Sequence, residues 1–412
     1  MFYNKSQIRS MFLLLFFLFF SVILVYSFAG GDGSLGSPYQ ITNCSDLQNM
    51  SFDLSANYTL NNDINCGVAP FNAGLGFRPV GNCTGNCFVG DDEFPFTGSL
   101  NGSGYEIQNL YINRGLNGTI GLFGTANNSV ISFVRLTNVN INGSSQVGGI
   151  VGWNNGLIIN SSVTGTIRGV GLIGGIVGNN YRNGHINHSF SSVTMIASGN
   201  SVGGLAGASS YAKIDNSYAI GSTQGLGSVG GFVGFFYYGE IDNSYSSGNV
   251  NGSSNIGGLV GYNKGVGAFI DNSYATGAVN GSSNVGGLVG LNFGFIDESF
   301  SIGFVKGSSN VGGLVGSGGA GVTSSFWDNE TSNRTTSAAG TQKSTAEMFL
   351  QSTYSGWSTS IWDFTNLTYP HLYWEGYVYP SSPPTLASIF PVQGLISVLL
   401  VFLGVVGFML FS

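Results

Sequence analysis

Four aspartates recur at one position of a repeating sequence, and they are the residues best suited to do chemistry. They are Asp215, Asp242, Asp271 and Asp297. Carboxylates on neighbouring turns of a stacked fold lie ~4.8 Å apart, so they could share Ca²⁺ or serve a polysaccharide lyase or hydrolase as acid and base. An identical residue repeated four times also fits a structural column, since Asp before Asn-Ser is a common turn residue. None of the four differs from its neighbours, so we expect no catalytic site and no required cofactor.

Histidine and cysteine supply the other candidate ligands. His185 and His188 have no third ligand nearby in the sequence, so a turn or strand-edge role is expected rather than a metal site. The same holds for Cys83-x3-Cys87, which lacks a second Cys or His pair. The chain has four cysteines, and an even number in an exported chain predicts two disulfides among Cys44, Cys66, Cys83 and Cys87. Three pairings are possible, and Cys44–Cys66 with Cys83–Cys87 encloses the shortest loops.

A sequence repeat must position these residues. Variants of the stretch 282–290 (SSNVGGLVG) return every 26 to 29 residues, and the second glycine of the pair marks seven copies: Gly149, Gly175, Gly204, Gly231, Gly258, Gly287 and Gly313. A degenerate first copy without the pair, 120–124 (IGLFG), places the marker at Gly121. Each copy holds three apolar segments of three to six residues, bounded by Gly, Asn or Ser, which suits strands and not helices. The pattern predicts an all-β fold, a parallel β-helix (β-solenoid) of ~27-residue coils with terminal caps. Eight coils ~4.8 Å apart make a rod roughly 40 Å long.

Aligned copies define columns of stacked residues. One column is aliphatic: Ile158, Ile186, Ile214, Ile241, Ile270, Ile296 and Val322. Four positions later stands an aromatic column, with Ser162 as the exception: Phe190, Tyr218, Tyr245, Tyr274, Phe300 and Phe326. The two positions have the same parity, so both columns are predicted to point inward along one strand.

Two further positions of the repeat have a predicted backbone role. Between the aliphatic and aromatic columns lie Asn160, Asn216, Asn243 and Asn272, replaced elsewhere by His188, Glu298 and Ser324. These asparagines form either an inward amide ladder or an exposed corner. The paired glycines of Gly258-Leu-Val-Gly261 and its copies are predicted to turn the chain sharply with φ > 0.

Apolar segments bracket the chain. Residues 1–29 combine Lys5 and Arg9 with an apolar run and small residues at 27–29, which predicts a secretory signal peptide, or alternatively an uncleaved anchor. Residues 392–411 carry no charge and are long enough, at ~30 Å as a helix, to cross a bilayer. A C-terminal transmembrane anchor is therefore predicted, although a tail replaced by a lipid has a similar pattern. Both predictions place the chain between them outside the cell, anchored to its membrane.

The remaining chain divides into four regions: an N-terminal closing region, the stacked repeats, a C-terminal cap region and a stalk. Residues 30–104 contain all four cysteines and lack the repeat, as a closing region does, and the repeats occupy 105–326. Residues 327–378 start with a Thr/Ser-rich passage, after which Ser344–Glu347 has capping-box spacing that predicts one short helix. An aromatic cluster follows: Trp357, Trp362, Phe364, Tyr369, Tyr373 and Trp374. We expect it to cover the end of the core, with a sugar platform as the alternative. Residues 379–391 read as a Pro/Ser stalk.

Composition restricts the partners. Only 8% of the 412 residues are charged, the net charge is −7, and no basic cluster occurs, so nucleic acid is not expected. Asn-x-Ser/Thr sequons are numerous and include Asn57, Asn82, Asn101, Asn117, Asn142, Asn251, Asn280 and Asn366. Those at Asn251 and Asn280 repeat at one coil corner, so glycans there are predicted to decorate one edge of the rod.

The repeat resembles a known family. Gly257–Gly261 with Ile270–Gly277 is similar to the GLUG repeat of large bacterial and archaeal surface proteins, as are the lead-in from Tyr39 and the tail through Trp357 and Tyr369-Pro370. The resemblance implies a β-helical, adhesin-like surface protein and brings no catalytic residues. We therefore expect a non-enzymatic rod that serves attachment or surface architecture and binds cell-surface glycans or other surface proteins. A polysaccharide lyase or hydrolase on the same scaffold is the alternative.

Overall fold

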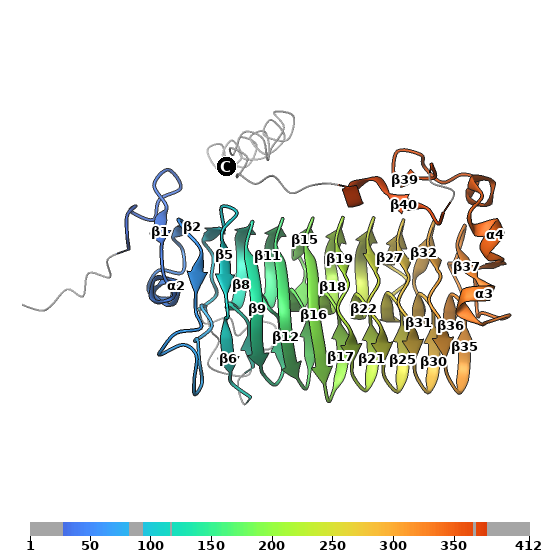
Figure 1. The fold of residues 1–412 in the computed structure, drawn as a ribbon, viewed down its shortest axis with the longest axis horizontal. Coiled ribbons are helices and arrows are strands. Elements are labelled where there is room, and N and C mark those ends of the chain that lie inside the picture. The colour runs from blue at the N-terminus through green and yellow to red at the C-terminus, as the bar shows by residue number, and fades with distance from the viewer. Residues whose placement is uncertain (1–27, 82–93, 116–117, 366–367, 377–412) are drawn as a thin grey trace, which may run out of the picture.

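The computed structural model describes residues 28–81, 94–115, 118–365 and 368–376, which form an elongated rod of stacked coils (Figure 1). Three parallel sheets run along the rod, and each coil contributes in turn to the second, first and third of them. The second sheet has eight strands, one from each regular coil. The predicted parallel β-solenoid is confirmed.

The first sheet has 14 strands. They are β1 (Tyr39–Ile41), β2 (Asn57–Leu60), β4 (Ser99–Asn101), β8 (Phe123–Ser132), β11 (Val151–Ile159), β14 (Val177–Tyr181), β15 (His185–Asn187), β18 (Ala206–Asp215), β22 (Val233–Asp242), β26 (Val260–Asn263), β27 (Ala268–Asp271), β31 (Val289–Asn292), β32 (Phe295–Asp297) and β36 (Val315–Ser317). The second sheet comprises β7 (Thr119–Ile120), β10 (Gln146–Val147), β13 (Leu172–Gly174), β17 (Asn200–Gly203), β21 (Gly227–Gly230), β25 (Ser254–Gly257), β30 (Ser283–Gly286) and β35 (Ser309–Gly312).

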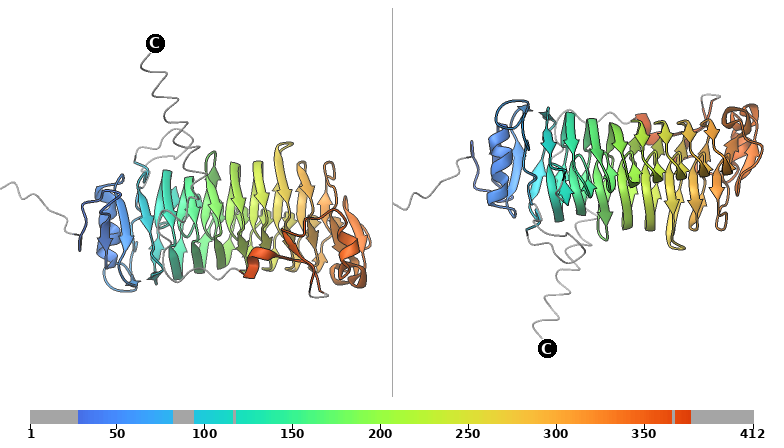
Figure 2. Two further views of the ribbon diagram at one scale, coloured as in Figure 1. Left: turned by 90° about the horizontal axis from the view of Figure 1, so that it is seen from above. Right: turned by 90° about the horizontal axis from the view of Figure 1, so that it is seen from below.

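The third sheet has 16 strands. They are β3 (Ile64–Asn65), β5 (Glu106–Gln108), β6 (Tyr111–Asn113), β9 (Arg135–Asn142), β12 (Ser162–Gly169), β16 (Phe190–Ala197), β19 (Tyr218–Ala219), β20 (Thr223–Gln224), β23 (Tyr245–Ser246), β24 (Val250–Asn251), β28 (Tyr274–Ala275), β29 (Val279–Asn280), β33 (Phe300–Ser301), β34 (Val305–Lys306), β37 (Phe326–Asp328) and β38 (Thr341–Lys343). A separate antiparallel pair, β39 (Trp362–Asp363) and β40 (His371–Leu372), lies beside the rod (Figures 1 and 2).

Short helices lie at the two ends. At the start are α2 (Cys44–Asn49) and the 3₁₀ turn Met50–Phe52; at the other end are α3 (Asn329–Ser332), α4 (Thr345–Met348) and the 3₁₀ turn Gln351–Tyr354. A further 3₁₀ turn, Tyr373–Gly376, lies beside the middle of the rod, where Trp374 packs on Tyr218 and Tyr245. The predicted capping box is present, because the Ser344 hydroxyl accepts from the Glu347 amide while the Glu347 carboxylate accepts from the Ser344 amide. One of the two predicted disulfides forms between Cys44 and Cys66, the pairing with the short loop, whereas Cys83 and Cys87 lie outside the described residues.

The aliphatic column forms the core of the first sheet. Ile186 pairs in parallel register with Ile158 and Ile214, and the register continues through Ile241, Ile270 and Ile296. Every one of these isoleucines is fully buried. Burial of each side chain contributes about 2 kcal/mol relative to exposure, so the column fixes which face of the strand points inward.

The asparagine column is a corner, which decides between the two alternatives that the sequence left open. Asn216, Asn243 and Asn272 have φ of 46°, 46° and 48°, and their replacements, His188 and Glu298 among them, are also left-handed. Asparagine tolerates this conformation better than most residues, which explains its recurrence.

A buried serine follows each corner residue and links the coils. The Ser217 hydroxyl donates to the carbonyl of Asp215 (2.8 Å) and accepts from the Ser189 amide of the preceding coil (3.1 Å). The same pair of bonds recurs at Ser244, Ser273 and Ser299. These hydroxyls satisfy backbone amides that the sharp turn would otherwise leave unpaired and buried.

The prediction of φ > 0 for the paired glycines is wrong. Among the described residues with φ > 0, none belongs to the glycine pairs. The pairs are required for close approach instead: a Cβ at Gly204 would lie 2.1 Å from the carbonyl oxygen of Gly231, and one at Gly203 would lie 2.0 Å from that of Ala206. Only glycine lets successive coils and the following strand come this close.

A buried amide ladder does exist, at a position that the sequence did not single out. Asn154 donates to the side-chain oxygen of Asn180 (2.9 Å), and Asn263 donates to that of Asn292 (2.8 Å). All four side chains are fully buried. The pattern was hard to detect because Ser209 and Phe236 occupy the same register position in the two intervening coils.

The predicted signal peptide and transmembrane segment fall almost wholly in residues 1–27 and 377–412, outside the described part of the chain. Within the described residues, no helix combines the length and apolarity needed to cross a bilayer.

Replacing a marker glycine by alanine tests the close-approach role. We expect Gly204→Ala to lower the free energy of unfolding by about 3 kcal/mol, because backbone rather than a flexible side chain blocks the added Cβ. Thermal and denaturant unfolding measure the change. Gly36→Ala is the matched control, since a Cβ there meets nothing within 4 Å. Equal stability of the two variants would contradict the interpretation.

Candidate functional site

The predicted aspartate column lies along the outer face of the first sheet. Asp215, Asp242, Asp271 and Asp297 follow one another in parallel register. The last three line a groove of about 470 Å³ together with Glu240, Asn272, Glu298, Ser358 and Ile361. The structure therefore gathers five carboxylates, of which the sequence had not singled out Glu240.

Asp271 is the electrostatically exceptional member of this groove. Asp242 accepts hydrogen bonds from Asn272 (3.0 Å) and Asn243 (3.1 Å), whereas the Asp271 carboxylate accepts none from a described residue. Burial, followed by the negative charge of Asp242 and Asp297, raises the pKa of Asp271 to about 6. Burial also raises the pKa of Asp242, but the hydrogen bond from Asn272 opposes this. Near neutral pH, Asp271 is thus the carboxyl group most easily protonated.

The two histidines occupy a strand edge and a corner. His185 begins β15, and its Nε2 lies 2.5 Å from Oδ1 of Asp215. His188 is at the left-handed corner beside Asn187, and burial lowers its pKa. Among the described residues, no three His, Cys, Asp or Glu side chains are arranged to hold a metal ion.

The aromatic column faces outward, so its predicted inward orientation is wrong. The left-handed corner residue lies between the two columns and reverses the side-chain parity: Ser246 and Ala275 are fully buried, while Tyr245 beside them points out. The rings stack almost in parallel from coil to coil. Centroid distances are 4.8 Å for Phe190–Tyr218, 5.0 Å for Tyr218–Tyr245, and 4.9 Å for both Tyr245–Tyr274 and Tyr274–Phe300. We call this column the aromatic ladder.

A C-terminal strap, residues 357–365 and 368–376, covers much of the ladder (Figures 1 and 2). Trp362 packs on Tyr274 and Phe300, and Trp374 packs on Tyr218 and Tyr245. Hydrogen bonds hold it in place, from Trp374 Nε1 to the Asn243 carbonyl (2.8 Å) and from the Tyr274 hydroxyl to Glu375 (2.9 Å).

The predicted C-terminal aromatic cluster therefore packs along the flank of the rod instead of over the end of its core. Trp357 and Trp362 are buried, which removes them as a sugar platform.

A second set of aromatic residues lies on the outer face of the first sheet, and its members range from the buried Trp153 to the half-exposed Tyr211 and Phe293. It crosses the outer face of the first sheet over six successive strands, from β11 to the end of β31, and consists of Trp153, Tyr181, Tyr211, Phe235, Tyr237, Tyr238, Tyr262 and Phe293, the residue that directly follows β31. We call it the aromatic strip. Each ring contacts the next, with centroid distances from 4.6 to 6.5 Å. Tyr211 and Phe293 are each 50% exposed.

The sequence signal for the strip is weak. Most copies of the repeat carry an aromatic residue after the last glycine of the motif, but at offsets that vary from one position at Trp153 to four at Tyr211. A search for stacked columns at fixed positions therefore misses it.

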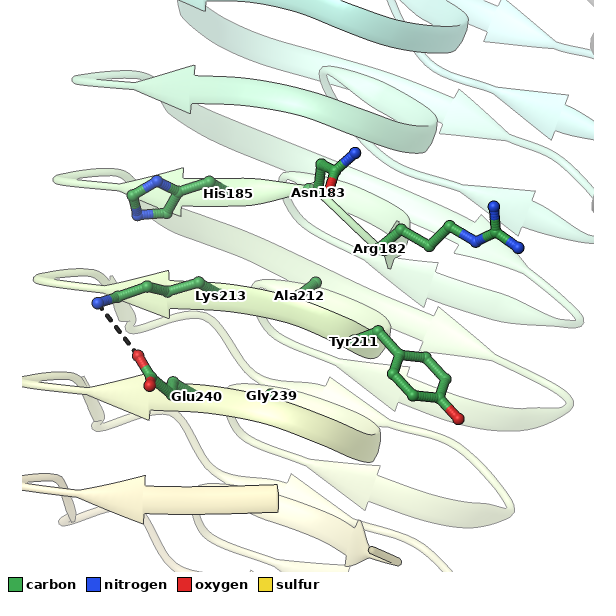
Figure 3. Close-up of a pocket in the computed structure, with 9 residues that line it drawn as sticks. Arg182, Asn183, His185, Tyr211, Ala212, Lys213, Gly239 and Glu240 are labelled. Atoms are coloured by element: carbon green, nitrogen blue, oxygen red, sulfur yellow. Dashed lines mark ion pairs between the residues drawn. The ribbon is translucent and has the colours of Figure 1, made fainter. Parts of the chain in front are cut away.

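A cleft of about 270 Å³ lies beside the strip (Figure 3). Arg182 and Tyr211 project on one side of it, and His185, Lys213 and Glu240 lie on the other. Lys213 forms an ion pair with Glu240 at 3.2 Å, so the charges of that second wall are largely balanced. The cleft combines an apolar ring face with polar groups at its edges, as sugar-sized binding sites do.

Three neighbouring coils have a left-handed residue at this cleft or directly beside it: Arg182 and Tyr211 line the cleft, and Tyr238 precedes the lining residue Gly239. Arg182, Tyr211 and Tyr238 have φ of 51°, 57° and 50°. Left-handed backbone at bulky residues costs about 1–2 kcal/mol each and buries no core side chain here.

The glycosylation candidates remain predictions. Asn251 and Asn280 are exposed and adjacent in register at one corner, as expected. The side chains of Asn57, Asn101 and Asn142 are half-buried and hydrogen-bonded within the rod. Asn82, Asn117 and Asn366 lie outside the described residues.

Comparison with known proteins confirms the resemblance of the repeat. The model of the GLUG motif matches residues 143–168 and 225–251. The chain carries GLUG repeats. Each matched segment is about one coil long and includes the third-sheet strand, β12 in the first match.

Two curated relatives share part of this GLUG-repeat chain. Halomucin of Haloquadratum walsbyi is 36% identical over 170 residues, which is 40% of this chain and 2% of halomucin. A protein of Evansella cellulosilytica named "Putative Gly-rich membrane protein" is 34% identical over 160 residues, 37% of this chain and 14% of that protein. The chain thus spans only a small part of the length of either relative.

One solved structure has a similar backbone trace. It is the crystal structure of a "putative immunoglobulin A1 protease" from Bacteroides ovatus, with a TM-score of 0.48 and 18% identity. The match covers 84% of this chain and 95% of that one. A likeness at this level carries no functional information.

The raised pKa of Asp271 predicts a pH-dependent loss of stability. Its folded pKa of about 6 exceeds the unfolded value of ~3.9, so the native state holds an extra proton between them and loses stability as pH rises through that window. We expect Asp271→Asn to melt at a higher temperature than the natural protein at pH 7 and at a similar one at pH 4. Asp297→Asn is the control and should show no gain, because that carboxylate accepts bonds from Glu298 and Thr323. Parallel pH profiles for the natural protein and Asp271→Asn would refute the assignment.

The packing of the strap can be tested separately. Trp374→Ala should lower the free energy of unfolding by roughly 3 kcal/mol and speed amide exchange at residues 368–376, because ring contacts and one hydrogen bond are lost. Hydrogen-exchange mass spectrometry measures the second effect. The neighbouring exposed Tyr373 provides the control, Tyr373→Ala, for which little change is expected. Unchanged exchange in Trp374→Ala would show that the strap is held by other contacts.

Proposed function

We propose that this chain is an exported surface protein whose β-solenoid binds glycans through the aromatic strip and catalyses no reaction on them. The observation that carries the proposal is the contrast between its two aromatic columns. The ladder is covered by the strap, whereas the rings of the strip from Tyr181 to Phe293 are partly to half exposed although they form a connected apolar surface. Exposed apolar surface of this kind marks a binding site more often than it occurs by chance.

The dimensions of the strip suit an extended chain. Its rings span six strands of the first sheet, and five steps of ~4.8 Å give a length of roughly 24 Å. Tyrosine and tryptophan present a rigid apolar face with a polar edge, which matches the mixed character of a sugar ring. Binding along the rod then uses many weak contacts in place of one deep pocket.

Location and scaffold agree with this role. The GLUG repeats and the name of the Evansella relative favour a surface protein, and the apolar stretches 1–29 and 392–411 would export and anchor it. A rod with few charges and many polar, uncharged side chains fits an extracellular attachment or architectural element.

Removal of two rings tests the proposal. Binding of the full chain to a panel of immobilised polysaccharides should be weakened roughly 30-fold in the double variant Tyr211→Ala/Tyr237→Ala, since each lost stacking contact costs about 1 kcal/mol. Tyr373→Ala removes an equally exposed tyrosine, 52% against 50%, from outside the strip and should bind like the natural protein. If the natural protein binds no polysaccharide, or if the double variant binds undiminished, the proposal fails.

A polysaccharide lyase or hydrolase is the second candidate, and Asp271 is the observation that favours it. A carboxyl group with a pKa of about 6 beside other carboxylates can act as a general acid near neutral pH. Release of sugar ends by the natural protein but not by Asp271→Asn would establish this activity. Retention of polysaccharide without release supports the non-catalytic role.

A further inference from the structure

Two cations lie on the aromatic strip without an acidic partner. The Arg182 guanidinium is 5.3 Å from the centre of the Tyr181 ring. The Lys264 ammonium is 5.6 Å from the Tyr237 ring and 5.8 Å from the Phe235 ring. Both side chains are exposed, and neither forms an ion pair with any residue in the described part of the chain.

The other charged groups at the cleft are already matched. Lys213 pairs with Glu240, and His185 pairs with Asp215. The uncompensated charge on the strip is therefore positive, although the protein as a whole has a net charge of −7. A local excess of positive charge on an acidic protein selects an anionic ligand.

We infer that the ligand of the strip is an acidic polysaccharide, one that carries carboxylate or sulfate groups along its length. This inference rests on the proposed glycan-binding function and specifies its substrate class. Sugar faces stack on the tyrosines while the anionic groups pair with Arg182 and Lys264. Arg182 can hold a carboxylate or sulfate with two parallel hydrogen bonds, which gives the contact directional specificity.

The spacing of the two cations suits a polymer better than a single sugar. Tyr181 and Tyr237 occupy the same register position two coils apart, and Lys264 follows in the next coil. Three steps of ~4.8 Å place the backbones of Arg182 and Lys264 roughly 14 Å apart along the rod. One chain lying on the strip can reach both.

The aspartate column limits where such a polymer lies. Asp242, Asp271 and Asp297 lie on the same face as the strip. Asp242 is the last residue of β22, which carries strip residues, and Asp271 and Asp297 are the last residues of β27 and β32 in the next two coils. Their negative charge disfavours any position of an anionic chain away from the rings. The ligand is thus confined to the tyrosine side of the cleft.

Matched pairs of polymers test the inference. Polygalacturonate and its methyl ester share a backbone and differ in carboxylate charge, and dextran sulfate and dextran form the equivalent pair for sulfate. Affinities of the natural full chain are measured for all four at low and high salt. We expect at least one acidic polymer to bind at least tenfold tighter than its neutral partner at low salt, with the difference reduced at high salt.

The variants assign this preference to the two cations. R182Q/K264Q should bring the acidic-to-neutral affinity ratio close to one. R168Q/K306Q removes the same charge from exposed positions on the third sheet and should leave the ratio unchanged. Equal affinity for acidic and neutral polymers, or a preference that survives R182Q/K264Q, overturns the inference and leaves the proposed glycan binding intact. Binding of none of the four polymers by the natural chain overturns both.

Discussion

Every feature of this rod depends on the backbone of one coil lying directly against the next. Parallel pairing holds successive coils ~4.8 Å apart, and this spacing must also be kept at the corners, where strands end. Glycine pairs do so at one corner, because a Cβ at Gly231 would lie 2.1 Å from the Gly258 carbonyl oxygen. At another corner, a left-handed asparagine is followed by a serine whose hydroxyl bonds to both coils. The recurrence of Gly-Gly and Asn-Ser in the sequence follows from these two requirements.

The fold could be predicted from the sequence because its period and its aliphatic column are repeated without interruption. The orientation of the aromatic column could not, since parity along a strand fails where a left-handed residue such as Asn243 intervenes. The aspartate column was recognised, but the contribution of Glu240 and Glu298 to its groove depends on neighbouring coils. The aromatic strip was missed because Trp153, Tyr211 and their counterparts arise at different offsets and meet only after folding.

The aromatic ladder and the aromatic strip have different roles. The ladder gives the C-terminal strap a regular series of rings to pack on, and Trp374 brings the end of the described chain back to the middle of the rod. The strip is left uncovered on the outer face of the first sheet, with positive charge above its rings and negative charge along its border. This asymmetry makes one surface suited to an extended acidic ligand.

Oxidative footprinting of the full chain with and without polygalacturonate tests this account most directly, because hydroxyl radicals modify exposed aromatic side chains and mass spectrometry locates them. The account predicts protection of Tyr211, Tyr237 and Tyr238, with no change at the exposed Phe269, Phe295 and Tyr373 outside the strip. Protection at these last three residues instead of the strip would contradict it. So would an unchanged pattern at concentrations of polymer that retain the protein.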